Sequence, residues 1–177
     1  MNTETSPVSR RVAWGAVLLA GVLSGTALAQ SGRAGEAPAM GQGPGYHSPQ
    51  SPIAPLKERE GVVSWSVLSA VTTKVEKNRV VPTFPVPVQA LNNQKVKVQG
   101  FMMPLGPGEK QSHFLLSSVP TSCSFCIPAG PEGLVEVRAT TPVRYSLEPV
   151  VMEGKLAVLT HDPYGIYYRL VEGEPAR

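Results

Sequence analysis

The residues best suited to chemistry are Cys123 and Cys126, which are the only two cysteines of the chain. Two thiols at this spacing can form a short disulfide, act as a redox pair or bind one soft metal ion. A thioredoxin-like redox pair needs its first thiolate at a helix N-terminus, where the helix dipole lowers the thiol pKa. The following segment, 127–133, contains two prolines and two glycines and does not favour a helix. The redox interpretation is therefore an alternative rather than the main expectation.

A metal site at these cysteines needs further ligands, because a closed zinc site takes four. The histidines that can supply them are His113, at the start of an apolar segment, and His161, in a predicted turn. For copper(I), a thioether from Met102 or Met103 is a further soft ligand. The metal interpretation thus takes zinc or copper as the ion, with a tentative ligand set of Cys123, Cys126, His113 and His161.

The N-terminal segment 1–29 has the pattern of a secretory signal peptide. Arg10 and Arg11 precede an apolar run over residues 12–23, which is shorter than the roughly 20 residues that a membrane span needs. The small residues Ala27 and Ala29 then frame a cleavage site. We expect a periplasmic or secreted protein with no membrane span once the signal is removed.

Export favours the third interpretation of the cysteines, a disulfide, because disulfides persist in oxidising compartments. The loop that Cys123 and Cys126 would close is short, so the bond contributes only about 2 kcal/mol to stability. A disulfide here is expected to stiffen a loop locally rather than to support the whole fold.

Composition excludes several classes of function. The formal net charge of +3 comes with no clustered basic stripe, so we expect no nucleic-acid partner. Glycine runs do not stand between a strand and a helix, and the Gly-x-Ser-x-Gly motif is missing from the sequence. We predict no catalytic or cofactor-binding residues, and the sequence leans toward a protein that is not an enzyme.

The chain is expected to contain one folded domain. Residues 30–60 are rich in Gly, Pro, Ser and Ala and are predicted to be a flexible tether. The domain is expected over residues 61–173, with a short tail at 174–177. With 18 prolines and 17 glycines in 177 residues, long helices are disfavoured and a loop-rich β fold is expected.

Within the domain, the first element is a short helix that Ser64 caps, with Trp65 and Leu68 on one face. The proline-rich segment 80–87 is expected to be an extended strap outside any sheet interior, with Phe84 directed inward. Alternating apolar residues and Gly/Pro turns then predict five strands. These cover residues 95–105, 113–117, 134–139, 149–159 and 166–171. The fold class is therefore mainly β, a small five-stranded OB-like barrel.

The segment Leu91–Leu105, together with Phe114-Leu115-Leu116 and the cysteine-proline loop, resembles the domain of unknown function 3299 family. The resemblance covers roughly residues 61–171, and its most specific part is Gly100-Phe101-Met102-Met103-Pro104-Leu105. The family consists of small exported bacterial proteins, often described near transport genes that handle metals. Many relatives have one cysteine and a histidine in the loop, where this chain has two cysteines and no histidine.

The expected function is that of a non-enzymatic periplasmic accessory protein of an envelope system. It would bind a soft metal ion or a protein partner, such as an envelope transport component, at the cysteine loop. The first alternative is a thiol-disulfide redox protein that uses Cys123 and Cys126. The second is a structural interaction module with an inert disulfide.

Overall fold

The computed structural model describes residues 41–77 and 79–176; the predicted signal peptide lies outside the described residues. The first element is the predicted short helix, α1 (Trp65–Leu68). The Ser64 side chain accepts a hydrogen bond from the Ser66 backbone N–H, as expected of an N-cap. Trp65 fixes the helix to the domain by donating its indole N–H to the Gln99 carbonyl at 2.8 Å. Among the described residues, no helix is long and apolar enough to cross a membrane.

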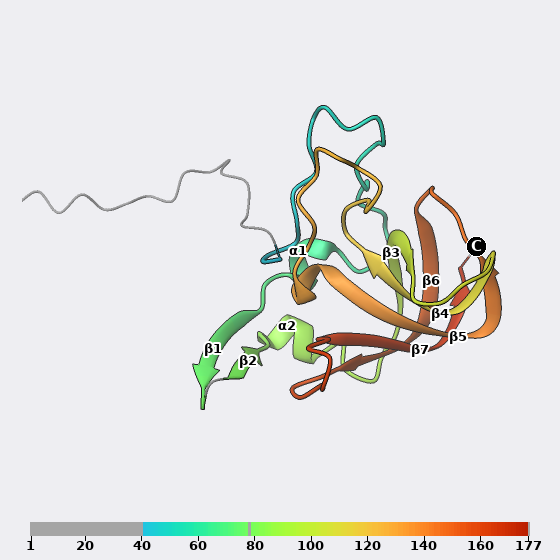
Figure 1. Cartoon of the computed structure of the whole chain (residues 1–177). Helices are drawn as coiled ribbons and strands as arrows, with labels where there is room; N and C mark the ends of the chain where they lie inside the picture. The colour runs from blue at the N-terminus through green and yellow to red at the C-terminus, as the bar shows by residue number, and fades with distance from the viewer. Residues whose placement is uncertain (1–40, 78, 177) are drawn as a thin grey trace, which may run out of the picture. The chain divides into compact units, whose positions relative to one another are not determined.

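Five strands form a closed barrel in the order β3-β4-β5-β7-β6, which confirms the predicted fold class (Figure 1). Only β5 and β7 pair in parallel, whereas the other neighbours in the barrel are antiparallel. This connectivity is OB-like. The strands are β3 (Lys95–Pro104), β4 (Lys110–Ser117), β5 (Leu134–Arg144), β6 (Val150–Val158) and β7 (Tyr168–Pro175).

The barrel closes because β3 changes its partner at Gly100. Residues Lys95–Gly100 pair with β6, and Phe101–Pro104 pair with β4. A Cβ atom at Gly100 would lie 2.9 Å from the Leu116 Cβ, closer than real Cβ contacts allow. A glycine is therefore required where the strand passes between its two neighbours.

The core is formed by alternate residues of the five strands, closed by the two short helices. Tyr168 is fully buried, and its hydroxyl donates a hydrogen bond to the Leu68 carbonyl at 2.6 Å. Phe84 is also buried and packs edge-on against Tyr167, so the predicted inward position of Phe84 is confirmed. The strand residues of the core are Val98, Met102, Phe114, Leu116, Val135, Val137, Met152, Leu156, Tyr168 and Leu170.

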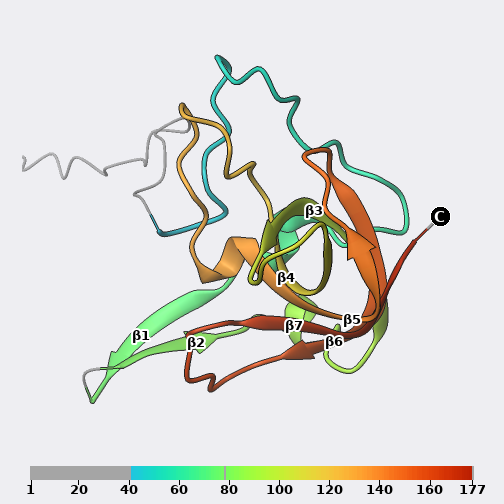
Figure 2. The ribbon, with the colours of Figure 1, turned by 45° about the vertical axis from the view of Figure 1, so that its right-hand side comes forward.

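A two-stranded hairpin, β1 (Thr72–Glu76) and β2 (Arg79–Thr83), lies outside the barrel (Figures 1 and 2). The proline-rich segment was expected to lie outside any sheet interior, and part of it is strand β2 of this hairpin. It is followed by α2 (Val86–Gln89). Every residue of β1 is exposed, so the strand has no alternation of core and surface residues from which it could be predicted.

Residues Gly41–Ser48, which belong to the predicted tether, pack against the loop between β4 and β5. Tyr46 and Ile127 exchange two backbone hydrogen bonds of 3.0 and 2.9 Å. A Cβ atom at Gly45 would lie 2.9 Å from the Ile127 carbonyl oxygen. The glycine content that suggests flexibility in the sequence therefore also permits two backbones to approach closely.

Candidate functional site

The candidate site is the outer face of β4, β5 and β7. Successive residues of a strand point to opposite faces, so strands whose alternate residues fill the core direct the intervening ones outward. On β5 the outward residues include Glu136, whose neighbours Val135 and Val137 are in the core. Glu136 stands opposite Leu115 of β4 and opposite Arg169 of β7. Side chains from three strands therefore converge on one carboxylate.

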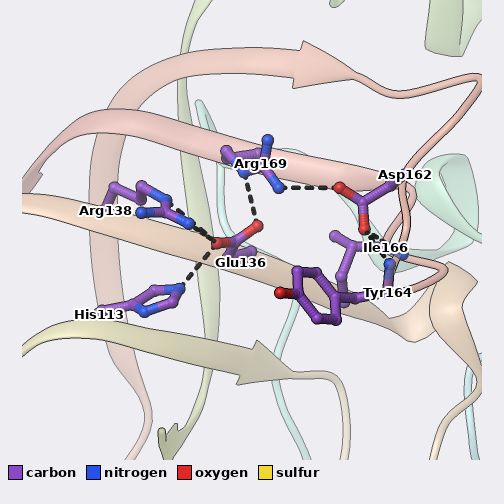
Figure 3. A network of polar contacts seen from close by, with 7 residues as sticks. All are labelled: His113, Glu136, Arg138, Asp162, Tyr164, Ile166 and Arg169. Carbon is purple, nitrogen blue, oxygen red and sulfur yellow. Dashed lines mark hydrogen bonds and ion pairs between the residues drawn. The ribbon is translucent and has the colours of Figure 1, made fainter.

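Glu136 is the centre of a polar network (Figure 3). Its Oε1 lies 2.7 Å from the His113 Nε2 and accepts hydrogen bonds from the Arg138 Nε and Nη2 at 3.1 and 2.8 Å. Its Oε2 accepts a hydrogen bond from the Arg169 Nε at 2.6 Å. One buried acid thus orients an imidazole and two guanidinium groups, which we call the Glu136 network.

A second carboxylate, Asp162, connects the Glu136 network to the loop between β6 and β7. Its Oδ2 accepts a hydrogen bond from the Arg169 Nη2 at 3.0 Å. Its Oδ1 accepts from the backbone N–H groups of Tyr164 and Ile166, at 2.9 and 3.3 Å. Gly165 has a positive φ of 74°. The turn expected here is confirmed, and Asp162 fixes its position relative to β7.

The network keeps both carboxylates ionised. Burial raises the pKa of Glu136, but hydrogen bonds from Arg169, His113 and Arg138 outweigh it and hold the pKa below its usual 4.5. Burial also raises the pKa of Asp162, and the N–H groups of Tyr164 and Ile166 together with Arg169 bring it below 3.8. At neutral pH the site therefore contains two carboxylates and two guanidinium cations.

The two kinds of charge differ in their exposure to solvent. The Glu136 and Asp162 side chains are only 6% and 5% exposed. The Arg138 and His113 side chains are 56% and 44% exposed. The carboxylates therefore lie beneath the basic groups, and a ligand that approaches this face meets the basic groups first.

Beside the network lies a hollow of about 360 Å³ with a largely apolar lining. Leu105 comes from the connection between β3 and β4, and Tyr164 and Ile166 come from the loop between β6 and β7. In OB folds, ligands bind to the face of the second and third strands and to these same two connections. The full lining consists of Leu105, His113, Leu115, Glu136, Arg138, Tyr164 and Ile166.

The two cysteines lie elsewhere, in the loop between β4 and β5, where they form a disulfide. Cys123 is 7% exposed, and the cysteine pair does not begin a helix. The next helical element is a short 3-10 turn, η1 (Pro131–Gly133), beyond the loop. The disulfide that the sequence favoured is therefore present, on a loop without the helix that thioredoxin-like chemistry needs.

The structure does not bring the four predicted metal ligands together. His113 belongs to the Glu136 network, and His161 is exposed beside Thr160. Within residues 41–77 and 79–176, no three His, Cys, Asp or Glu side chains are placed to hold one metal ion. Met102, considered for copper(I), is buried in the core. Zinc or copper binding by this set stays a prediction, for which the structure gives no assembled site.

The acidic and basic residues at the centre of the site were not singled out from the sequence. A signal was present: Glu136 and Arg138 stand two residues apart in the otherwise apolar segment 134–139, and therefore on one face of the strand. Their convergence with Arg169 depends on the parallel pairing of β5 with β7, which local alternation does not reveal.

Fold and site together define a small OB-like barrel protein with a charged outer face beside an apolar hollow. Residues 53–165 match the family model described as a protein of unknown function (DUF3299), and the chain belongs to this family. A crystal structure of a DUF3299 family protein from Pseudomonas aeruginosa PAO1 is 22% identical, with a TM-score of 0.37. That similarity covers 50% of this chain and 64% of the other, less than two thirds of its length. No curated protein shows significant similarity to the chain.

Proposed function

We propose that the chain is an exported, non-enzymatic binding protein of the cell envelope, with its ligand site on the outer face of β4, β5 and β7. The observation that carries this proposal is the Glu136 network beside the apolar hollow. Burying a carboxylate costs desolvation energy that an ion pair often fails to recover, so such a network is a poor way to gain stability. It is an effective way to hold exposed donors in fixed positions for a ligand.

Binding is a better account of this face than catalysis. An imidazole paired with a carboxylate is an arrangement that general bases use. Glu136, however, is shared with two guanidinium groups, and among the described residues that line the hollow there is no serine, threonine, cysteine or lysine to act as a nucleophile. The donors of the face are suited to holding a ligand.

Export and the disulfide support the proposed compartment. The signal pattern of residues 1–29 predicts transfer out of the cytoplasm. A disulfide between Cys123 and Cys126 is the form that such a compartment maintains. We therefore propose that the cysteine loop is a stiffened structural element. As the partner of the protein we propose an envelope transport component.

The compartment is tested by expressing the full-length gene in a bacterium and measuring the intact mass of the purified periplasmic protein. We expect a chain that begins at Gln30 and lacks the two thiol hydrogens of Cys123 and Cys126. A protein that stays in the cytoplasm with residues 1–29 attached would contradict the export part of the proposal.

The binding face is tested by a fragment screen, with NMR chemical-shift changes of the labelled periplasmic protein as the readout. We expect the fragments that bind to shift the signals of His113, Arg138 and Tyr164. These shifts should be lost in Arg138→Gln and kept in Arg144→Gln, which changes an exposed arginine of the same strand. Fragments that bind only at the other hollows, such as the one lined by Arg79, His161 and Tyr167, would contradict the proposal.

A further inference from the structure

Resting on the proposed function, we infer that the ligand of this face carries a carboxylate joined to an apolar body. Arg138 binds the carboxylate, and the apolar body occupies the hollow beside it. The class of ligand follows from three features of the face: the depth of its charges, the free edge of one guanidinium and the lining of the hollow.

The difference in burial between the carboxylates and the guanidinium groups determines whether the ligand carries a negative or a positive charge. The formal charges of Glu136, Asp162, Arg138 and Arg169 cancel, so the network attracts neither sign through its net charge. The carboxylates are buried, however, whereas more than half of the Arg138 side chain is exposed. A cation would approach a guanidinium first, and a neutral molecule would give the guanidinium no charged partner. An anion is the complement of what this face exposes.

The geometry of Arg138 favours a planar, two-oxygen anion. Its hydrogen bonds to Glu136 use the Nε and Nη2 atoms, which form one edge of the guanidinium. Among the described residues, the Nη1 atom has no side-chain acceptor, so the terminal edge of this exposed guanidinium is free to bind an outside partner. A carboxylate matches such an edge with two parallel hydrogen bonds. His113 contacts the Glu136 carboxylate through Nε2 and forms part of the wall of the hollow beside Arg138.

The hollow accounts for the apolar body. Its volume of about 360 Å³ lies within the range of small-molecule sites. Leu105, Leu115 and Ile166 supply aliphatic surface, and Tyr164 adds an exposed aromatic ring at the rim. Filling the hollow with an apolar group removes this surface from water, which stabilises the complex.

The test is a titration of the labelled periplasmic protein with three probes of nearly equal shape: 3-phenylpropionate, 3-phenylpropionamide and 3-phenylpropylamine. We expect the carboxylate to shift His113, Arg138 and Tyr164, and to bind about tenfold or more tightly than the amide, as charge-assisted hydrogen bonds imply. The amine should bind most weakly. In Arg138→Gln the advantage of the carboxylate should disappear, whereas in Arg144→Gln it should remain.

Two results would overturn the inference. If the amide or the amine binds this face as tightly as the carboxylate, the ligand class is wrong although the face still binds ligands. If the carboxylate binds elsewhere or not at all, the inference also fails. The fragment screen then decides separately whether the face is a binding site, so the two proposals fail on different measurements.

Discussion

The Glu136 network and the cysteine loop are held in place in different ways. The network is positioned by three paired strands, and its buried acid is bonded to side chains from each of them. The cysteine loop is held by its disulfide and by backbone hydrogen bonds to Tyr46 in a segment that precedes the barrel. The residues whose chemistry is most visible in the sequence therefore lie on a peripheral loop, whereas the better-organised polar site is made of ordinary strand residues.

The largest expected effect comes from removing the acid at the centre of the network. Glu136→Ala leaves the guanidinium of Arg169 and the imidazole of His113 without their shared partner. We expect a loss of about 3 kcal/mol of unfolding free energy, measured by urea denaturation, because the partly buried Arg169 loses one of its two carboxylate partners and the removed side chain leaves a gap. The matched control is Glu109→Ala, because Glu109 is exposed and its ion pair with Arg144 spans 3.8 Å. A loss in Glu136→Ala no larger than in the control would show that the network is not integral to the barrel.

Removing the disulfide should have a smaller and more local effect. The double variant Cys123→Ser/Cys126→Ser is expected to lose about 2 kcal/mol. Hydrogen exchange should accelerate at the amides of Tyr46 and Ile127, which bond each other, and should be unchanged in β4 and β5. Faster exchange throughout β4 and β5 would mean that the cysteine loop supports the barrel. It would contradict the claim that the cysteine loop and the Glu136 network are held in place independently.

Two glycines with similar backbone conformations provide a finer test of the peripheral segment. Gly45 and Gly61 have φ values of 79° and 74°, but only at Gly45 would an added Cβ meet other atoms. An alanine with positive φ has the same conformational cost at either position. The additional steric clash should therefore make the unfolding free energy of Gly45→Ala about 1 kcal/mol lower than that of Gly61→Ala. Exchange at the Ile127 amide measures the difference directly. Equal protection in the two variants would show that segment 41–48 is not held by close packing on the loop.

The smallest expected effect is on the stability of the protein at acid pH. The pKa values of Glu136 and Asp162 are lowered on folding, so below their unfolded values the unfolded state binds more protons than the folded state. Their contribution to stability is therefore complete above about pH 4.5 and is lost as the pH falls through the folded values. Melting temperatures measured from pH 7 to pH 3 should fall less steeply in Glu136→Gln than in the original protein. Parallel curves would exclude Glu136 as a source of acid sensitivity.

The fold was predictable to the extent that each strand carries its own pattern. Alternation around Val96 and Val98 identified β3, and the Gly/Pro turns separated the five strands of the barrel. The strand β1 was missed because all five of its residues are exposed, which leaves no burial pattern to recognise. The steric requirement for Gly100 could not be predicted from its own strand, because it comes from Leu116 on a neighbouring strand.

The site was less predictable than the fold because its parts meet through pairing between distant strands. Glu136 and Arg138 can be placed on one face from their spacing alone. Arg169, 33 residues from Glu136, reaches it only because β7 lies parallel to β5. His113 and His161 were considered as partners of the cysteines on residue type, but residue type does not reveal that His113 is bonded to Glu136.

The most direct test of the proposed binding face is to map the chemical-shift changes that ligands cause in the labelled protein during the fragment screen. We predict chemical-shift changes at His113, Arg138 and Tyr164, with Phe125 and Ile127 of the cysteine loop unaffected. Changes confined to Phe125 and Ile127, with no change on the outer face of β4, β5 and β7, would contradict this prediction.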